Sequence, residues 1–346
     1  MQLLPSGLER QDDNTSWLLV SDHIPHSNIG IDIDYDYRKH NDQVTFFDHY
    51  IGYNEDDTNF CKDRIFLCSE LLSECHYFKK LNFSVVPAHS KTINFCAFMQ
   101  NQRPSRILAS AWMKKHFDNK DNFFYTQRFG TQDDFVNLYH LLENTNYIDM
   151  LSNKKKTFLP PKYIGKYLNE PGCGDDGRSK NYEVHTAPIE QTSLISIITE
   201  PMFWEKGCMF TEKIIQACVS CSVPFFISGH ATPDYFEKLG FYAFKDLIDY
   251  SAMEESDPVI KTMKLLDDNL DLLKEGFDYN KYKYEIEHNF HHIQDPYSIL
   301  EKIYQNNNQD LFKKWFDTIL EIHTSYGSTF DLQPVLDLYK KLEKTI

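Results

Sequence analysis

Short apolar runs alternate with segments of helical periodicity over the first 150 residues of the chain. The apolar runs are short enough for strands, and they predict four of them, at 44–47, 64–68, 83–86 and 93–98. Helical spacing predicts helices at 105–116 and 132–143. Strands that alternate with helices are typical of α/β proteins built on parallel sheets.

A second alternation follows a change of composition. Residues 152–181 are rich in Lys, Pro and Gly and have no sustained periodicity, which indicates a connection between domains. Beyond it, the same criteria predict strands at 194–199 and 223–228 and helices at 211–220 and 233–239. The remainder is helical, with apolar faces formed by Met263, Leu266, Leu270 and Leu273 and by Leu311, Trp315, Ile319 and Leu320.

Composition narrows the class of protein. The 346 residues suggest two domains, and 41% hydrophobic with 25% charged residues is ordinary for a globular protein. The net charge of −15 argues against a surface built to neutralise many phosphates, although it permits one local basic cleft. The longest apolar runs are far shorter than a membrane span, and the N-terminus has no signal-peptide pattern. We therefore expect a soluble cytoplasmic protein.

Several patterns typical of metal or redox sites lack the context that those sites need. The pair Cys218-x-x-Cys221 ends a predicted helix, so we expect buried thiols in a reducing compartment. The Asp-x-Asp-x-Asp run at 32–36 precedes any predicted α/β core, and the Gly-x-Gly-x-x-Gly run at 172–177 follows no strand. The histidines within 288–292 lack a carboxylate–His motif and predict a polar helix face. We expect neither a metal nor a cofactor.

The segment 194–247 carries the most informative chemistry. It predicts a buried strand, a loop and then a helix with Thr211 as N-cap, so Glu212 and Lys213 fall in the first turn. A helix N-terminus after a strand is a natural site for a diphosphate, and an anion there would offset the unfavourable position of Lys213 against the helix dipole. Glu212 could accept both hydroxyls of a ribose. The alternative is ordinary first-turn chemistry on a surface helix.

Two segments resemble the α-1,3-fucosyltransferase family. The first runs from Glu200 through Phe210-Thr-Glu-Lys213 and Val223-Pro-Phe-Phe to Gly229, like the donor-binding signature of that family. The second is Lys91-x-x-x-Phe95-Cys96-Ala-Phe98-x-x-Asn101, followed by Arg106 and a helix. Two later segments, at 240–249 and 287–289, are similar to viral and phage relatives. The chain departs from the family at 198–201, where Ile-Thr-Glu-Pro replaces a Phe-Glu-Asn element.

The resemblance implies a glycosyltransferase with two Rossmann-like domains facing a cleft, the GT-B fold. The acceptor-side domain would span 1–155, the connection 156–190, the nucleotide-sugar-binding domain 191–296 and C-terminal helices 297–346. The implied reaction is inverting and metal-independent. It moves a sugar from a nucleotide-diphosphate donor, such as GDP-fucose, to a hydroxyl of a glycan or other acceptor, with the nucleotide sugar as substrate rather than cofactor.

The resemblance also assigns donor-site residues. Glu212 would hold the donor ribose, and Lys213 with Arg106 would neutralise the diphosphate leaving group. Glu200 would line the nucleotide site. The other donor-side candidates, drawn from the same motifs, are Thr211, Gly229, Arg103 and Asn101.

An inverting transfer also needs a base. The family places it just after a strand of the first domain, and Glu70 follows the apolar run at 65–68. Open parallel sheets present ligands at the carboxyl ends of their strands, which favours Glu70 for this role. Glu74, Asp48 and His89 are the alternatives.

Two other functions remain open from the sequence. One is sugar transfer onto hydroxymethylated bases of viral DNA, which the net charge disfavours. The other is a non-catalytic binding protein that retains the fold. It predicts that Glu70, Arg106, Glu212 and Lys213 do not converge on one cleft, because catalysis requires contact distances.

Overall fold

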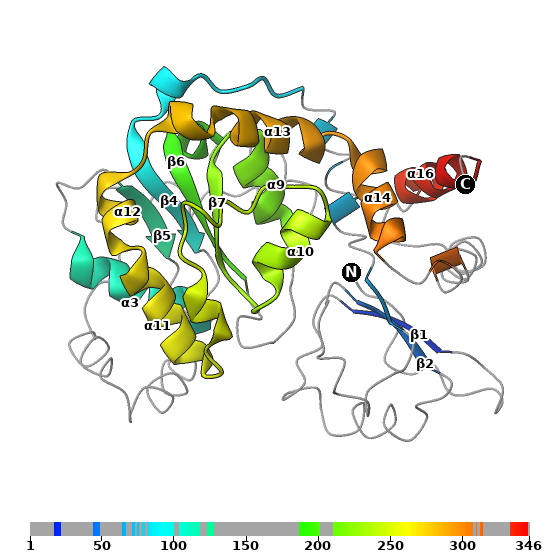
Figure 1. Cartoon of the computed structure of the whole chain (residues 1–346), viewed down its shortest axis with the longest axis horizontal. Helices are drawn as coiled ribbons and strands as arrows, with labels where there is room; N and C mark the ends of the chain where they lie inside the picture. Colours follow the sequence, from blue (N-terminus) through cyan, green and yellow to red (C-terminus); the bar gives the residue numbers. More distant parts are fainter. Residues whose placement is uncertain are drawn as a thin grey trace, which may run out of the picture.

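The computed structural model describes residues 17–21, 44–48, 64–66, 71–72, 75, 78–79, 82–99, 104–117, 123–127, 187–200, 210–306, 309, 312–313 and 333–344. These residues form two parallel sheets, the larger of which is covered by helices (Figure 1). The three-stranded sheet has the order β1 (Trp17–Ser21), β2 (Val44–Asp48), β3 (Arg64–Phe66). The four-stranded sheet has the order β5 (Phe123–Gln127), β4 (Ile93–Met99), β6 (Ser193–Thr199), β7 (Val223–Ile227).

The four-stranded sheet has the apolar strands that a sheet covered on both faces requires. Each of its neighbouring pairs is parallel, and all five residues of β7 are buried. Pro224 lies inside β7, opposite Ser196 of β6. A proline is compatible with this position because β7 is the last strand of the described sheet, so one side of its backbone needs no ladder partner.

The strand order changes direction at β4. The connection from β4 to β5 moves to one side, whereas β6 and then β7 follow on the other side. Because such crossovers are right-handed, α3 (Pro104–His116) and α9 (Glu212–Val219) cover opposite faces of the sheet. The crevice between the carboxyl ends of β4 and β6 is therefore the position at which sheets of this kind bind ligands.

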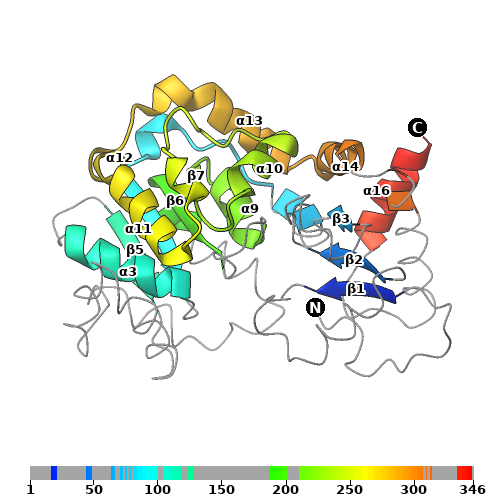
Figure 2. The same ribbon diagram turned by 60° about the horizontal axis from the view of Figure 1, so that its bottom comes forward.

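Further helices complete the two faces (Figures 1 and 2). On one face, α11 (Pro258–Asp268) packs on α3, and α12 (Leu270–Glu275) contacts β4. On the other, α13 (Lys283–Ile293) packs on α9. The remaining elements are α8 (Ala187–Glu190), α10 (Thr232–Lys238), α14 (Pro296–Gln305), α16 (Gln333–Glu343), η1 (Ala88–Ser90), η3 (Ser251–Glu254) and η4 (Tyr279–Tyr282).

The C-terminal helices α14 and α16 contact each other. Figures 1 and 2 both show them on the side of the four-stranded sheet where the three-stranded sheet lies. In the ranges that the structure describes, no helix combines the length and the apolar character needed to cross a membrane.

The α/β class predicted from the sequence is confirmed. Most predicted elements within the described ranges are present, including the strands at 93–98 and 194–199 and the helix at 105–116. The strand predicted at 83–86 is irregular chain. Its residues are exposed or half-buried except Val86, so the short apolar run there does not enter a sheet. The predicted helices at 132–143 and 311–320 fall on residues outside the described ranges or only partly within them.

The division between the sheets differs from the predicted domain boundary at residue 155. β4 and β5 precede that boundary, yet β4 pairs directly with β6, which follows it. The two sheets divide between β3 and β4 instead. An apolar run specifies a buried strand but does not specify its neighbour in the sheet, so the pattern alone could not locate this division.

The buried thiols match the interpretation from the sequence. Cys75, Cys96, Cys218 and Cys221 are buried, and all but Cys96 lie in the main hydrophobic cluster. Burial raises the pKa of the Cys218 thiol well above its ordinary value. Burial also raises the pKa values of Cys96 and Cys221, so these three thiols are protonated, and all four pack as small apolar groups.

Candidate functional site

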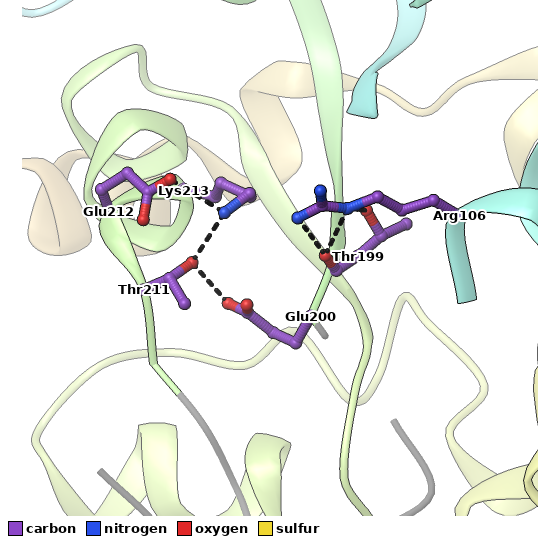
Figure 3. A network of polar contacts seen from close by, with 6 residues as sticks. All are labelled: Arg106, Thr199, Glu200, Thr211, Glu212 and Lys213. Atoms are coloured by element: carbon purple, nitrogen blue, oxygen red, sulfur yellow. Dashed lines mark hydrogen bonds and ion pairs between the residues drawn. The ribbon is translucent and has the colours of Figure 1, made fainter. Parts of the chain in front are cut away.

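Five of the predicted site residues lie together at the carboxyl ends of β4 and β6 (Figure 3). Arg106 comes from the first turn of α3, which begins a few residues after β4. Glu200 directly follows β6. Thr211, Glu212 and Lys213 open α9. α3 thus meets β6 and α9, which lie about a hundred residues later in the sequence, at the point where the strand order reverses.

Arg106 is fixed against the end of β6. Its side chain is buried, and Nε donates to the Thr199 hydroxyl at 3.3 Å and to the Thr199 carbonyl oxygen at 3.4 Å. The neighbouring Ser105 hydroxyl donates to the carbonyl oxygen of Glu200 at 2.9 Å. These bonds attach α3 to β6 and hold a permanent positive charge in the crevice.

Glu200 is a fully buried carboxyl group. Oε1 accepts a hydrogen bond from the Thr211 hydroxyl at 2.8 Å, whereas Oε2 is buried without a partner among the described residues. Burial raises the pKa of Glu200 to about 7, and the charge of Glu212 adds to the effect while Lys213 and Arg106 oppose it. The group therefore changes its ionisation near neutral pH.

Thr211 occupies the N-cap position of α9 without capping the helix. Its backbone is extended, with φ −117° and ψ 177°, but its side chain makes no cap hydrogen bond. The hydroxyl donates to Glu200 instead. The start of α9 consequently has no side-chain cap from Thr211, and an uncapped helix start offers backbone N–H groups to an anion.

Lys213 and Glu212 form an ion pair beside this helix start. Lys213 Nζ donates to Glu212 Oε1 at 2.9 Å and to the Thr211 hydroxyl at 3.2 Å. Both side chains are partly exposed, at 19% for Lys213 and 27% for Glu212. An ammonium group has three donors, so these two bonds leave one N–H for a ligand.

The arrangement is suited to binding an anion. Figure 3 shows the guanidinium of Arg106 and the ammonium of Lys213 extending toward one another, with the carboxyl group of Glu200 beside them. Two cations and an uncapped helix start around one point can neutralise the charge of a diphosphate. The partly exposed carboxylate of Glu212 can accept hydrogen bonds from hydroxyl groups of the same ligand.

The neighbouring strand end contributes Gly229 and a lysine that the sequence analysis did not single out. Gly229 is buried two residues after β7, and its carbonyl oxygen accepts from the Thr232 N–H at 3.2 Å. Lys261 of α11 is 1% exposed, and Nζ donates to the Ser228 carbonyl oxygen at 2.9 Å. The available signal was that one of the two lysines at 258–266 falls among the apolar residues of a predicted helix.

The other candidates divide into two groups. Glu70, Glu74, Asn101 and Arg103 lie outside the described residues. His89 lies on η1 before β4, at the opposite end of the strand from the crevice, so the structure excludes it as a base acting there. Asp48 is the last residue of β2 in the three-stranded sheet.

Lys91, part of the second resembling segment, also lies away from the crevice. It precedes β4, and Nζ donates to the carbonyl oxygens of Ser193 and Ser220, each at 2.8 Å, and to the Ser222 hydroxyl at 3.2 Å. Burial lowers the pKa of Lys91 to about 8. Its role is to join the starts of neighbouring strands.

The described residues contain no group of three or more His, Cys, Asp or Glu side chains arranged to hold a metal ion. Two of the histidines considered above bind backbone carbonyl oxygens at the end of α10. His288 Nε2 bonds to Gly240 and His292 Nε2 to Leu239, each at 2.8 Å. Because a carbonyl only accepts, both Nε2 atoms carry the hydrogen.

Comparisons of the chain with protein-family models, with curated proteins and with solved structures gave no match.

Proposed function

We propose that the chain is a glycosyltransferase that moves a sugar from a nucleotide-diphosphate donor to a hydroxyl group. The observation that carries the proposal is the meeting of Arg106 and Lys213 at the crevice between β4 and β6, beside the start of α9. These cations belong to the two segments in which the sequence resembles α-1,3-fucosyltransferases. The resemblance favours a GDP-fucose-like donor.

The proposed donor site assigns a separate task to each group. Arg106 and Lys213 bind the diphosphate and stabilise the negative charge that grows on it as the bond to the sugar breaks. The N–H groups at the start of α9 also stabilise this negative charge. Glu212 accepts hydrogen bonds from the ribose hydroxyls, which orients the donor. None of these steps requires a metal ion.

The acceptor side of the proposal rests on sequence. In the GT-B arrangement, a second Rossmann-like domain faces the donor domain, and the three-stranded parallel sheet is the candidate for it. In the sequence, Glu70 comes four residues after the end of β3, and it is the proposed base that deprotonates the acceptor hydroxyl.

The convergence of Arg106, Glu212 and Lys213 favours an enzyme over a binding protein that merely retains the fold. Two cations that extend toward one another beside a helix start suit the diphosphate leaving group of a sugar transfer, whose negative charge grows in the transition state. Glu70 lies outside the described residues and does not enter this comparison.

Thermal unfolding in the presence of nucleotide sugars tests the proposal. GDP-, UDP-, CMP- and dTDP-sugars are added separately to the wild type and to Glu212→Ala. A ligand at a hundred times its dissociation constant stabilises a protein by about 2.7 kcal/mol, which raises Tm measurably. We expect one nucleotide class to stabilise the wild type and to lose its effect in the variant. Equal Tm values with all four classes and without ligand would exclude a nucleotide-sugar site.

A further inference from the structure

The contacts of Glu200 couple its carboxyl group to the two cations of the crevice. A hydroxyl has one hydrogen, and Thr211 gives its hydrogen to Glu200 Oε1 at 2.8 Å. The lone pairs of that hydroxyl therefore face Lys213, whose Nζ donates to it at 3.2 Å. The carboxyl group thus sets the direction of both bonds, and together with Glu212, which accepts from Nζ at 2.9 Å, it positions the ammonium of Lys213.

The second oxygen of the same group has no partner. Glu200 Oε2 is buried and lacks a hydrogen bond among the described residues, and Figure 3 shows the carboxyl group near both Arg106 and Lys213. An ionised carboxylate with an unsatisfied buried oxygen is costly unless nearby cations stabilise it. Here the stabilising charges are the same cations that an anionic ligand would neutralise.

We infer that Glu200 is a positioning residue of the anion site and that it takes up a proton, on Oε2, when an anion lies between Arg106 and Lys213. The proton comes from solvent. The resulting O–H becomes a donor that faces the anion, while Oε1 continues to accept from Thr211 in both states. The inference rests on the proposed function in one respect only, which is that the anion binds between Arg106 and Lys213.

The charges around Glu200 agree with the uptake of a proton when an anion binds. The groups that face it are Arg106 of α3 together with Lys213 and Glu212 of α9. β7 supplies no charged side chain, and Lys261 of α11 reaches the strand end through the Ser228 carbonyl oxygen. The pKa of Glu200 is about 7 with burial raising it and the two cations opposing that rise, so an anion that offsets the cations moves the pKa further upward.

The test counts protons when an anion is added. Sulfate is the probe because it carries two charges and does not titrate near neutral pH. It is added to weakly buffered protein at pH 7, and the uptake is measured with a pH electrode. We expect up to about half a proton per chain for the wild type, because a group with a pKa of about 7 is half protonated before the anion binds.

Two variants test whether Glu200 is the group that takes up the proton. Glu200→Gln keeps an oxygen for Thr211 and so keeps the position of Lys213, but it cannot titrate; we expect sulfate to bind it without proton uptake. Glu254→Gln, at an exposed site on η3, should keep the wild-type uptake. Infrared difference spectra should show the carbonyl stretch of a protonated carboxyl group appearing with sulfate in the wild type and absent in Glu200→Gln.

Absence of uptake in the wild type, or equal uptake in the wild type and Glu200→Gln, would overturn the inference. Its failure is separable from failure of the proposed function. Proton uptake with sulfate but no stabilisation by any nucleotide sugar would contradict the glycosyltransferase and leave Glu200 as inferred. Stabilisation by a nucleotide sugar without proton uptake would contradict the inference about Glu200 and leave the glycosyltransferase proposal in place.

Discussion

Thr211 stands at the N-cap of α9, yet its hydroxyl donates to the buried carboxyl group of Glu200 rather than to the helix. A side-chain cap stabilises a helix start by about 1 kcal/mol, and here that contribution is absent. In exchange, the bond joins the end of β6 to the start of α9 and gives a buried acid its partner. Among the described residues, Thr211 leaves the first N–H groups of α9 without a side-chain cap, which connects the local hydrogen bonding to the proposed donor site.

Thr211→Val should destabilise the fold because it removes the only described partner of the Glu200 side chain. Leaving a buried polar group unsatisfied costs about 1–3 kcal/mol, and the loss should be greater at about pH 8 than at about pH 6 because an ionised carboxylate needs the bond more. Urea unfolding at the two pH values measures it. Thr211→Ser keeps the hydroxyl and should stay within about 1 kcal/mol of the wild type. Equal losses for Val and Ser would contradict the assigned bond.

The ionisation of Glu200 should also appear in the pH dependence of stability. Its pKa is raised from 4.5 to about 7 in the fold, so the folded state binds more protons than the unfolded state between these values. The stabilisation is complete below the unfolded pKa and is lost as the pH rises through the folded pKa. Relative to Glu200→Gln, the wild type should lose free energy of unfolding on the order of 3 kcal/mol between about pH 4.5 and about pH 8. A difference that stays constant with pH would show that Glu200 does not titrate in this range.

Gly240 is required by its backbone and by a neighbouring ring. It has φ +98°, and a Cβ built there lies 2.7 Å from Nε2 of His292. Gly240→Ala should therefore destabilise the protein by about 1–3 kcal/mol in thermal or urea unfolding. In a His292→Ala background the clash disappears and only the backbone strain remains, so the same substitution should cost less. An identical cost in both backgrounds would exclude the contact with His292.

Much of the four-stranded sheet could be predicted because its strands are short and apolar. The helix starting at 105 and the N-cap position of Thr211 also followed from local patterns, which depend on the nearest residues. The sequence placed Met263, Leu266, Leu270 and Leu273 on one helix. The structure ends α11 at Asp268 and begins α12 at Leu270, where Asn269 binds the backbone of Asp249.

The properties that were not predictable depend on distant partners. The pairing of β4 with β6 joins residues about a hundred positions apart, and no local pattern encodes it. Likewise, the meeting of Arg106 with Thr199 and of Thr211 with Glu200 depends on that pairing. The candidate site was therefore assembled from a resemblance at the level of sequence, whereas its hydrogen-bond directions and the burial of Glu200 required the structure.

The binding of a nucleotide diphosphate between Arg106 and Lys213 is the central claim, and calorimetric titration tests it most directly. The nucleotide that stabilises the wild type best is titrated into the wild type, Lys213→Met and Lys264→Met. Lys264 is a matched control because it is more exposed and pairs with Glu255 on the surface. A hydrogen bond to a charged group contributes about 1.5–3 kcal/mol, so Kd should rise about 10- to 100-fold in Lys213→Met and stay near the wild-type value in Lys264→Met. An unchanged Kd in Lys213→Met would contradict the account.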